Sequence, residues 1–347
     1  MKQKNMAKYI YVLNLLVIAF FFSCTSSPNV GQTQMDKKRI EPAALKTIKL
    51  DLDSLVLGHV TGYAIGDNSD VYMTDGRIIV QTDKDGKLIS HVNRQGPSPS
   101  EYVKLRNLAI YNGHLYAWDA MGLSLLEFDL DLNFVSKMNG PGIAIKDFLV
   151  TSSGDVYYYL AGNPDHLIAK TFADYPDSIK YEGGISAEDE ALLIYTYSKC
   201  MGVLDGEVFY SSPSRMELKC FEGRKQDICL SDDDFKVEEV KGTPSRDMNA
   251  MFEYINRNSV ITGLSKGRKN NYLLTETGTV TVENNIADTS QRMINILAFD
   301  RKGSVLSGIQ LPLRTGNYKM VGDRWYSLEY TEDEDLLLNI LDVDKAL

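Results

Sequence analysis

A short hairpin pattern that recurs six times is the feature that most constrains how this chain can fold. Each copy has one or two turn residues, a variable residue, an apolar residue and then an aromatic one, and successive copies end 41 to 64 residues apart. Each lies between two apolar runs that are too short for helices, which is typical of a β-hairpin. The copies are 68–72, 112–116, 153–157, 205–209, 269–273 and 322–326, and the fifth is degenerate.

A second hairpin pattern occurs within three of these repeats. Residues 79–89 and 125–135 superpose at an offset of 46 residues, and residues 298–306 repeat the same order of strand, acidic turn and strand. Two hairpins per repeat give four antiparallel strands, and units of this size must stack on one another to bury both of their faces. The sequence therefore predicts an all-β fold, a six-bladed β-propeller of four-stranded antiparallel blades.

The two ends of the chain indicate how the ring closes. After the sixth copy only one clear strand remains, at 335–342, so the last blade lacks its outermost strand. A spare strand at 46–57 precedes the first blade. Because a strand from the opposite terminus would cover the exposed edge, we expect the ring to be closed by this N-terminal strand.

The N-terminus has the features of a secretion signal. Three lysines within the first eight residues precede an apolar run, 9–22, that is too short to span a bilayer as a stable helix. The run ends at Ser23-Cys24, and a small residue directly before a Cys is similar to the lipoprotein signal, in which the thiol is acylated. A plain signal peptide with an incidental Cys is the alternative. We expect a signal peptide at 1–23, lipidation at Cys24, a flexible tether at 24–44 and the propeller at 45–347.

The lipoprotein start, the six hairpins and the segment Gln95–Tyr102 together resemble the TolB-like six-bladed propeller lipoproteins of Bacteroidetes. The segment is similar to the Gly-Pro-x-Glu-Tyr loop of that family, and the resemblance covers about residues 45–343. It implies a propeller fold and a cell-envelope location, and it supplies no catalytic residues. The family's signal for surface export is an acidic run after the Cys, which Thr25–Pro28 lacks. We therefore expect an outer-membrane lipoprotein that faces the periplasm.

Charge restricts the partners of the chain. Its 37 Lys and Arg against 47 Asp and Glu give a formal net charge of −10. An acidic protein repels nucleic-acid phosphates and anionic lipid headgroups. We expect no nucleic-acid partner, contact with the membrane only through the N-terminal lipid, and a monomer.

The sequence contains no recognisable catalytic or metal-binding motif. Gly263–Gly267 matches the Gly-x-Ser-x-Gly pattern of hydrolases, but that motif requires a helix after the Ser and a strand follows here, which predicts a hairpin turn. The four His are dispersed, and the acidic loops lack the spacing of a calcium loop. We predict no catalytic residue, no metal and no cofactor, while the question of enzymatic activity stays open. Cys220 and Cys229 flank a predicted turn and form either a disulfide or two neighbouring buried thiols.

Two long connections between blades contain the candidate binding residues. Such connections open on the face around the channel of a propeller, where sites are usually placed. The connection into the second blade is lengthened around 98–102, and we expect Glu101 and Tyr102 to overhang the channel mouth, with Arg94 and Gln95 beside them. The alternative is a structural linker whose Tyr packs between blades.

The connection into the fifth blade is far longer and contains a predicted helix, from Ser245 through Arg257. Its apolar face includes the candidate binding residues Met248 and Phe252. This face either covers the ends of the blades or forms a lid or partner-docking helix.

These features predict a lipid-anchored cell-envelope propeller that acts as a ligand-binding or protein-interaction module. Its partner would be an unidentified protein, small molecule or glycan. The alternative is an envelope hydrolase or lyase that acts on a glycan or peptide at the channel mouth. Two or more carboxylates or His within about 6 Å of one another in the channel would favour the enzyme, and an apolar and aromatic mouth would favour binding.

Overall fold

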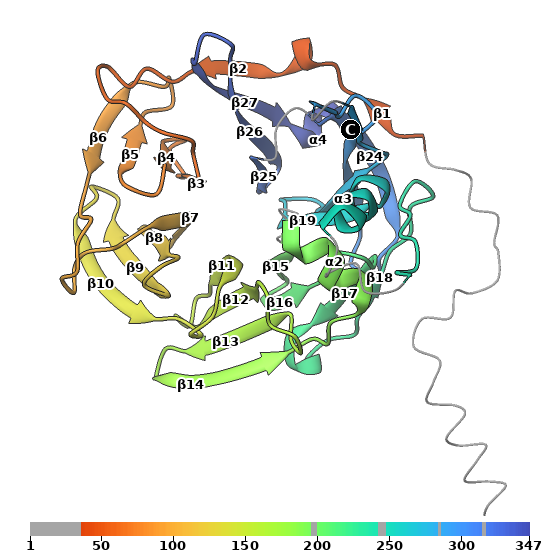
Figure 1. Cartoon of the computed structure of the whole chain (residues 1–347), viewed down its shortest axis with the longest axis horizontal. Helices are drawn as coiled ribbons and strands as arrows, with labels where there is room; N and C mark the ends of the chain where they lie inside the picture. The colour runs from red at the N-terminus through yellow and green to blue at the C-terminus, as the bar shows by residue number, and fades with distance from the viewer. Residues whose placement is uncertain (1–35, 196–199, 242–247, 284–285, 314–316) are drawn as a thin grey trace, which may run out of the picture. The chain divides into compact units, whose positions relative to one another are not determined.

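Six four-stranded blades surround a central axis in the computed structural model (Figure 1). The structure describes residues 36–195, 200–241, 248–283, 286–313 and 317–347. Consecutive strands of each blade are antiparallel neighbours, and the first strand of each blade is the innermost. The predicted all-β, six-bladed propeller is confirmed.

Each blade has four strands; the fourth strand of blade six comes from the N-terminal part of the chain, and blade five contains a small inserted hairpin in addition. Blades one to three consist of β3 (Gly62–Ile65), β4 (Val71–Thr74), β5 (Ile79–Thr82) and β6 (Leu88–Val92); β7 (Leu105–Tyr111), β8 (His114–Asp119), β9 (Ser124–Asp129) and β10 (Phe134–Asn139); and β11 (Ile145–Val150), β12 (Val156–Leu160), β13 (Ile168–Phe172) and β14 (Tyr175–Glu182). Blades four to six consist of β15 (Met201–Leu204), β16 (Glu207–Tyr210), β17 (Glu217–Cys220) and β18 (Ile228–Cys229); β19 (Val260–Lys266), β20 (Asn271–Thr277), β23 (Met293–Phe299) and β24 (Val305–Pro312), with the hairpin β21 (Thr281–Glu283) and β22 (Ile286–Asp288) inserted; and β25 (Tyr318–Val321), β26 (Arg324–Tyr330) and β27 (Leu336–Asp342).

Each of the six predicted hairpin copies leads into the second strand of a blade. The turns at Asn112-Gly113 and Asp205-Gly206 have positive φ at both central residues, as the twist of a two-residue hairpin requires. The last residue of every copy is buried, because the second strand lies inside the blade and packs against its neighbours. The repeat therefore predicted the strand that anchors each blade.

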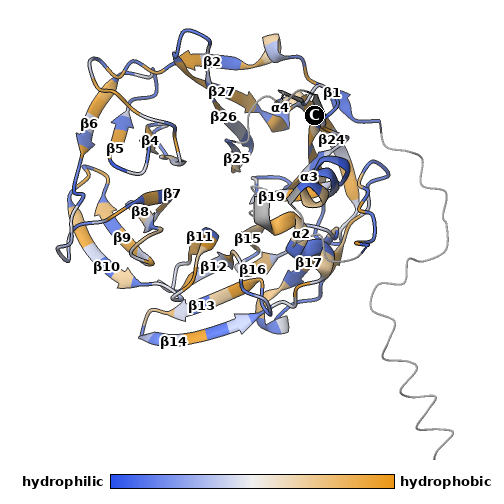
Figure 2. Cartoon of the chain, in the orientation of Figure 1, coloured by the Kyte–Doolittle hydropathy of each residue, from blue (hydrophilic) through white to orange (hydrophobic). Residues whose placement is uncertain are grey.

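Hydrophobic clusters between neighbouring blades form the core. One cluster joins blades one and two, where Tyr72, Leu105 and Phe128 are buried together. Another joins blades five and six, around Tyr272 and Trp325. Figure 2 shows hydrophobic residues along the strands of all the blades. Each blade thus buries its faces only by stacking on the next one, which makes closure of the ring important for stability.

The ring is closed by the N-terminal strand, as predicted. β2 (Lys46–Lys49) pairs antiparallel with β27 and becomes the outermost strand of blade six. The regular strand is shorter than the predicted 46–57. Beyond it, the backbone N–H of Asp51 donates a hydrogen bond to the carbonyl of Gly86 in blade one (2.7 Å).

Residues 36–44, predicted to be tether, pack against blades four to six, so that prediction is wrong for them. Lys37 Nζ lies 2.5 Å from Asp232 Oδ1, and both side chains are buried. β1 (Lys38–Arg39) pairs in parallel with β24, and the 3-10 helix η1 (Pro42–Ala44) follows it. We call residues 36–51 the closing belt, because they run along the outer edges of the ring from blade four to blade one (Figure 1).

Within the part of the chain that the structure describes, three helices and a second 3-10 turn complete the fold. They are α2 (Ala187–Tyr195), α3 (Met248–Arg257), α4 (Val343–Ala346) and η2 (Phe221–Gly223). Ser186 and Asp189 cap α2 reciprocally, each side chain accepting the backbone N–H of the other residue.

Two sequence motifs have structural roles. All of the Gly-x-Ser-x-Gly motif except Gly267 belongs to β19, and the hydroxyl of Ser265 donates to the Gly322 carbonyl (3.3 Å). No helix follows the motif, so it does not form a nucleophile elbow. Cys220 is a free buried thiol. The disulfide between Cys220 and Cys229, one of the two alternatives that the sequence left open, is therefore absent.

Candidate functional site

The connections that lead from one blade to the next lie on one face of the ring, which we call the connecting face. It includes the described connections 50–61, 93–104, 140–144, 183–195, 230–241 and 248–259, together with the turn after the second strand of each blade. α2 and α3 contact each other on this face over blades four and five, across the ring from the connection into blade two (Figure 1). Both connections singled out from the sequence therefore belong to the same face.

Tyr102 lies in the core and not over the channel. Its side chain is fully buried in the cluster between blades one and two. Its hydroxyl donates to the Arg77 carbonyl (2.9 Å) and accepts from the Arg94 N–H (3.2 Å). The prediction that Tyr102 contacts a ligand is wrong, because no part of the ring is exposed. The structural linker, whose Tyr packs between blades, is the alternative that fits.

Glu101 lies at the outer rim of the ring, so its predicted place over the channel mouth is also wrong. Its backbone carbonyl accepts a hydrogen bond from Lys137 Nζ on β10, the outermost strand of blade two (2.8 Å). Its carboxylate accepts the N–H of Ser98 (2.7 Å), which lowers the pKa of Glu101 from its usual value. Of the other candidates in this connection, Arg94 is half-buried and Gln95 is exposed, with Gln95 Nε2 donating to the Val103 carbonyl (3.1 Å).

The predicted helix in the connection into blade five is present and ends at Arg257, as expected. Its expected start at Ser245 lies outside the described residues, and Met248 is its first described residue. Met251 is buried, whereas Phe252 is exposed. The apolar face of α3 is therefore partly buried, and the aromatic side chain of Phe252 stays at the surface.

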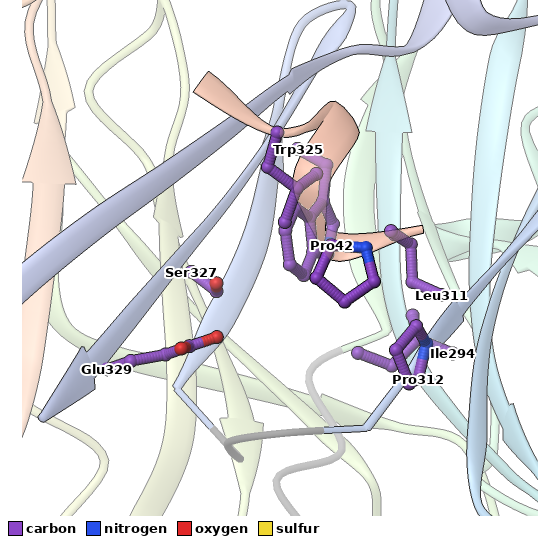
Figure 3. Close-up of a pocket in the computed structure, with 8 residues that line it drawn as sticks. Pro42, Ile294, Leu311, Pro312, Trp325, Ser327 and Glu329 are labelled. Atoms are coloured by element: carbon purple, nitrogen blue, oxygen red, sulfur yellow. The ribbon is translucent and has the colours of Figure 1, made fainter. Parts of the chain in front are cut away.

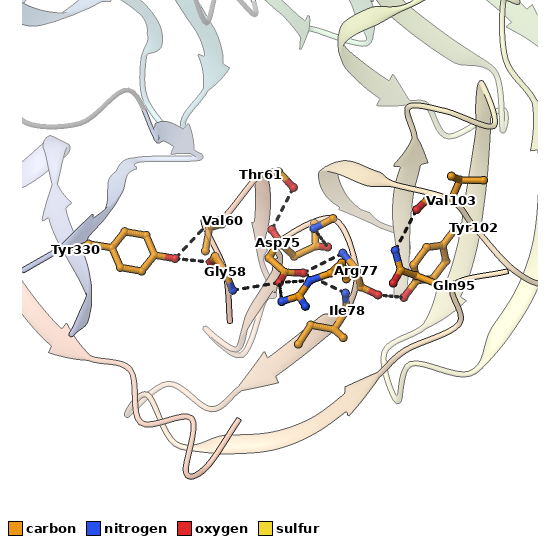
Figure 4. A network of polar contacts seen from close by, with 12 residues as sticks. Gly58, Val60, Thr61, Asp75, Arg77, Ile78, Gln95, Tyr102, Val103 and Tyr330 are labelled. Carbon is orange, nitrogen blue, oxygen red and sulfur yellow. Dashed lines mark hydrogen bonds and ion pairs between the residues drawn. The ribbon is translucent and has the colours of Figure 1, made fainter. Parts of the chain in front are cut away.

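A polar network that the sequence did not reveal lies where the ring closes (Figure 4). The buried carboxylate of Asp75, in the turn after β4, accepts hydrogen bonds from Gly58 N (3.0 Å) and from Arg77 Nη2 (2.6 Å). It also accepts the backbone N–H groups of Arg77 and Ile78 (2.9 and 3.2 Å). Burial alone would raise the pKa of Asp75, but these hydrogen bonds outweigh it and hold the pKa below its usual value.

This carboxylate fixes the guanidinium of Arg77 at the surface. Arg77 donates to Asp75 through Nε (3.0 Å) and Nη2, while its side chain stays 58% exposed. Its Nη1 has no partner among the residues that the structure describes. A guanidinium held in this way loses less conformational freedom when it binds a ligand than a free one does.

Aromatic side chains flank Arg77 on the side of blade six. The Tyr330 hydroxyl donates to the Gly58 carbonyl (2.8 Å) and accepts the Val60 N–H (3.3 Å). The His59 ring stacks on the exposed Tyr330 ring, with centroids 6.0 Å apart. Val56, in the same connection, is 81% exposed.

Apolar side chains flank Arg77 on the side of blade two. The fully buried Asp119 carboxylate accepts the backbone N–H groups of Val103, Lys104 and Met121 (3.0, 3.0 and 3.2 Å). This arrangement holds Val103 and Met121 close to each other at the surface, where they are 50% and 67% exposed.

Lys104 connects the two sides. Gly76, beside Arg77, has φ +98°, and a Cβ placed on it would be in van der Waals contact with Lys104 Cγ and Cε (3.4 and 3.8 Å). The lysine side chain therefore lies over this glycine, next to Arg77. We call the whole set the ring-closure strip; its members are Val56, His59, Arg77, Val103, Lys104, Met121 and Tyr330.

The innermost strands bear on the choice between binding and catalysis. In the sequences of β3, β7, β11, β15, β19 and β25, Asp147 is the single carboxylate and no His occurs. The pair of channel carboxylates or His that would favour an enzyme is therefore not found on these strands. Among the described residues, no group of three or more His, Cys, Asp and Glu could hold a metal ion.

A pocket of about 290 Å³, part of which is open to solvent, lies beneath the closing belt between blades five and six (Figure 3). Most of its lining is apolar, and the buried Trp325 Nε1 has no hydrogen-bond partner among the described residues. The lining residues are Pro42, Leu45, Ile294, Leu311, Pro312, Trp325, Ser327 and Glu329. With one carboxylate and no His, this pocket offers no pair of groups for acid–base catalysis.

Comparison with known proteins agrees with the architecture. The sequence model of the DUF5128 family, described as a 6-bladed beta-propeller, matches residues 63–175, from β3 to the first residue of β14. The protein is a six-bladed β-propeller. A search of curated proteins gives no significant match to its sequence.

Two solved structures from Bacteroides share the propeller over most of their length. A Bacteroides fragilis protein whose name proposes export has a TM-score of 0.59 at 13% identity, with 88% of this chain and 98% of that chain covered. A Bacteroides vulgatus member of the DUF4221 family has a TM-score of 0.63 at 10% identity, with 86% and 98% covered. At such identities the likeness shows the fold alone. Among the described helices, none has the length and apolar character needed to cross a bilayer.

Proposed function

We propose that this propeller is a protein-interaction module of the cell envelope that binds its partner through the connecting face. The observation that carries the proposal is the ring-closure strip, in which exposed apolar and aromatic side chains surround a fixed arginine. Tyr, Met and Arg are enriched at the centres of protein interfaces, and a few such residues supply most of the binding energy.

The rigidity of the strip supports this role. Asp75 and Asp119 are buried, and each uses its oxygens on backbone N–H groups of the strip or of residues next to it. Because the backbone is already held in place, a partner would bind without first ordering a loop. Phe252 on α3 adds an exposed aromatic residue across the same face.

Replacing two apolar residues of the strip tests the proposal. In the full-length protein, Val56→Ser with Met121→Ser should reduce capture of the native envelope partner at least about tenfold, because interface anchors of this kind contribute more than 1 kcal/mol each. Thermal unfolding should not change, since both side chains are exposed. The measurement is cross-linking and affinity capture from detergent-solubilised membranes, quantified by mass spectrometry.

Leu306→Ser is the matched control, because Leu306 is an exposed apolar residue near the start of β24, away from the connecting face. It should leave capture unchanged. If Leu306→Ser abolishes capture and the strip variant does not, the proposed face is the wrong one.

We also propose that Cys24 is the lipidated N-terminal residue and that it anchors the propeller to the outer membrane, facing the periplasm. The apolar run that ends at Ser23-Cys24 supports this proposal. Cys24→Ala should release the protein from the membrane fraction or leave the signal uncleaved. Unchanged fractionation, with no lipid mass on the mature N-terminus, would contradict it, and protease shaving of intact cells would test the leaflet.

A further inference from the structure

The exposed charges of the ring-closure strip are positive, although the whole protein is acidic. The formal net charge of the protein is −10. Within the ring-closure strip, however, the exposed side chains that carry a full charge are Arg77 and Lys104, which lie over blades one and two. Arg106, the second residue of β7, is also exposed. The carboxylates nearest to these cations, Asp75 and Asp119, are buried and accept internal hydrogen bonds, and the exposed carboxylates Glu332, Asp333 and Glu334 lie in the turn after β26, on the blade-six side.

The unpaired edge of Arg77 is suited to a carboxylate. The Asp75 carboxylate accepts hydrogen bonds from Nε and Nη2 of Arg77, so Nη1 remains available to a ligand. Lys104 lies over Gly76 next to it and would provide a second positive charge. Charge-assisted hydrogen bonds from such groups are about twice as strong as neutral ones.

Apolar surface lies on both sides of these cations. Tyr330, on which the His59 ring stacks, is on one side, where the connection also contains the exposed Val56, and Val103 and Met121 are on the other. An occupant that satisfies the whole strip must therefore be extended, with a negative centre and apolar groups on either side. A protein segment meets this description, whereas nucleic acid carries a negative charge on every nucleotide and is repelled by the net charge of the protein.

From this charge complementarity we propose that the ring-closure strip binds an extended acidic segment of a partner protein. A carboxylate of the segment is held by Arg77 and Lys104, and apolar side chains before and after it pack on the two flanks. The proposal rests on the proposed function and specifies the chemistry of the partner.

Labelled synthetic peptides test this inference with the full-length protein in detergent. The first peptide has a central Asp-Glu pair flanked by Leu and Phe; the second has Asn-Gln, and the third has Lys-Lys, at the same positions. We expect the acidic peptide to bind about tenfold more tightly than the amide peptide, which is the effect of one charge-assisted hydrogen bond. The advantage should shrink between 50 and 500 mM salt, as expected for partly exposed charges. Equal binding of the three peptides in fluorescence anisotropy would overturn the proposal.

Variants locate the effect. Arg77→Gln should remove most of the preference for the acidic peptide, and Lys104→Gln, which leaves the network around Asp75 intact, should reduce it in the same direction. Arg301→Gln changes an exposed arginine in the turn between β23 and β24, on the opposite face, and should change nothing. Persistence of the preference in both strip variants, or tighter binding to vesicles of anionic phospholipid than to the acidic peptide, would overturn the inference.

The outcomes separate this inference from the proposed function. If the apolar variant loses the native partner while Arg77→Gln and Lys104→Gln retain it, the connecting face binds a protein but the acidic chemistry is wrong. If none of these variants affects capture, the proposed function itself is wrong. If size-exclusion chromatography with light scattering shows that the chain binds a second copy of itself through this face, the face mediates self-association and the proposal of a separate partner protein is wrong.

Discussion

Tyr102→Ala should lower the free energy of unfolding by about 3–5 kcal/mol, the range found when a large buried aromatic side chain is truncated. The ring of Tyr102 is fully buried between blades one and two, so its removal leaves a cavity that the neighbouring strands cannot fill. Guanidinium-induced unfolding should show a lower midpoint with an unchanged slope, because the surface exposed on unfolding stays the same.

Two further variants separate the ring from its hydroxyl and from the surrounding loop. Tyr102→Phe keeps the ring but leaves the Arg77 carbonyl without its donor, and should cost about 1–3 kcal/mol. Val103→Ala truncates the next, half-exposed side chain and should change stability by less than about 0.5 kcal/mol. If Tyr102→Ala were as mild as Val103→Ala, the ring would not belong to the core.

The fold could be predicted from the sequence because its repeating unit is local. Each hairpin copy specifies a turn and a buried aromatic within five residues, and six copies fix the number of blades. The first part of the closing belt could not be found in this way. Lys38 and Arg39 are exposed, and Lys37 is held by Asp232, which lies 195 residues away in the sequence. Such a segment has no hydrophobic period, because its structure depends on contacts with distant residues.

The candidate site was only partly predictable, for a related reason. The sequence located the connecting face, because long loops identify the connections between blades. It did not show that Tyr102 is buried, since this depends on backbone groups of Arg77 and Arg94 in two separate turns. The ring-closure strip draws on blades six, one and two, and each contributing segment resembles an ordinary turn. Asp75-Gly76-Arg77 is the one local pattern that could have pointed to it, and a single such turn is not distinctive.

Deleting residues 1–51, which removes the closing belt, should destabilise the propeller much more than deleting residues 1–35, which leaves the belt in place. Ile40 and Leu50 are both buried, and together their burial contributes about 3–6 kcal/mol. The deletion also exposes the edge of β27, which is covered by β2 in the intact protein. An uncovered strand edge pairs readily with other chains, so we expect aggregation as well as a lower melting temperature. Calorimetry measures the melting temperature, and size-exclusion chromatography detects the aggregation.

An intermediate truncation and a peptide added in trans test whether the belt acts as the closing strand. Deleting residues 1–45 removes Ile40 and the cover of the pocket at Trp325 but keeps β2, so its effect should lie between the other two. A synthetic peptide of residues 36–57 should restore part of the stability of the 1–51 deletion, because it supplies the missing strand to β27. A peptide in which Ile48 and Leu50 are replaced by Asp should fail to do so. If all truncations melt at the same temperature, blade six is complete without the N-terminal strand and the ring closes by another contact.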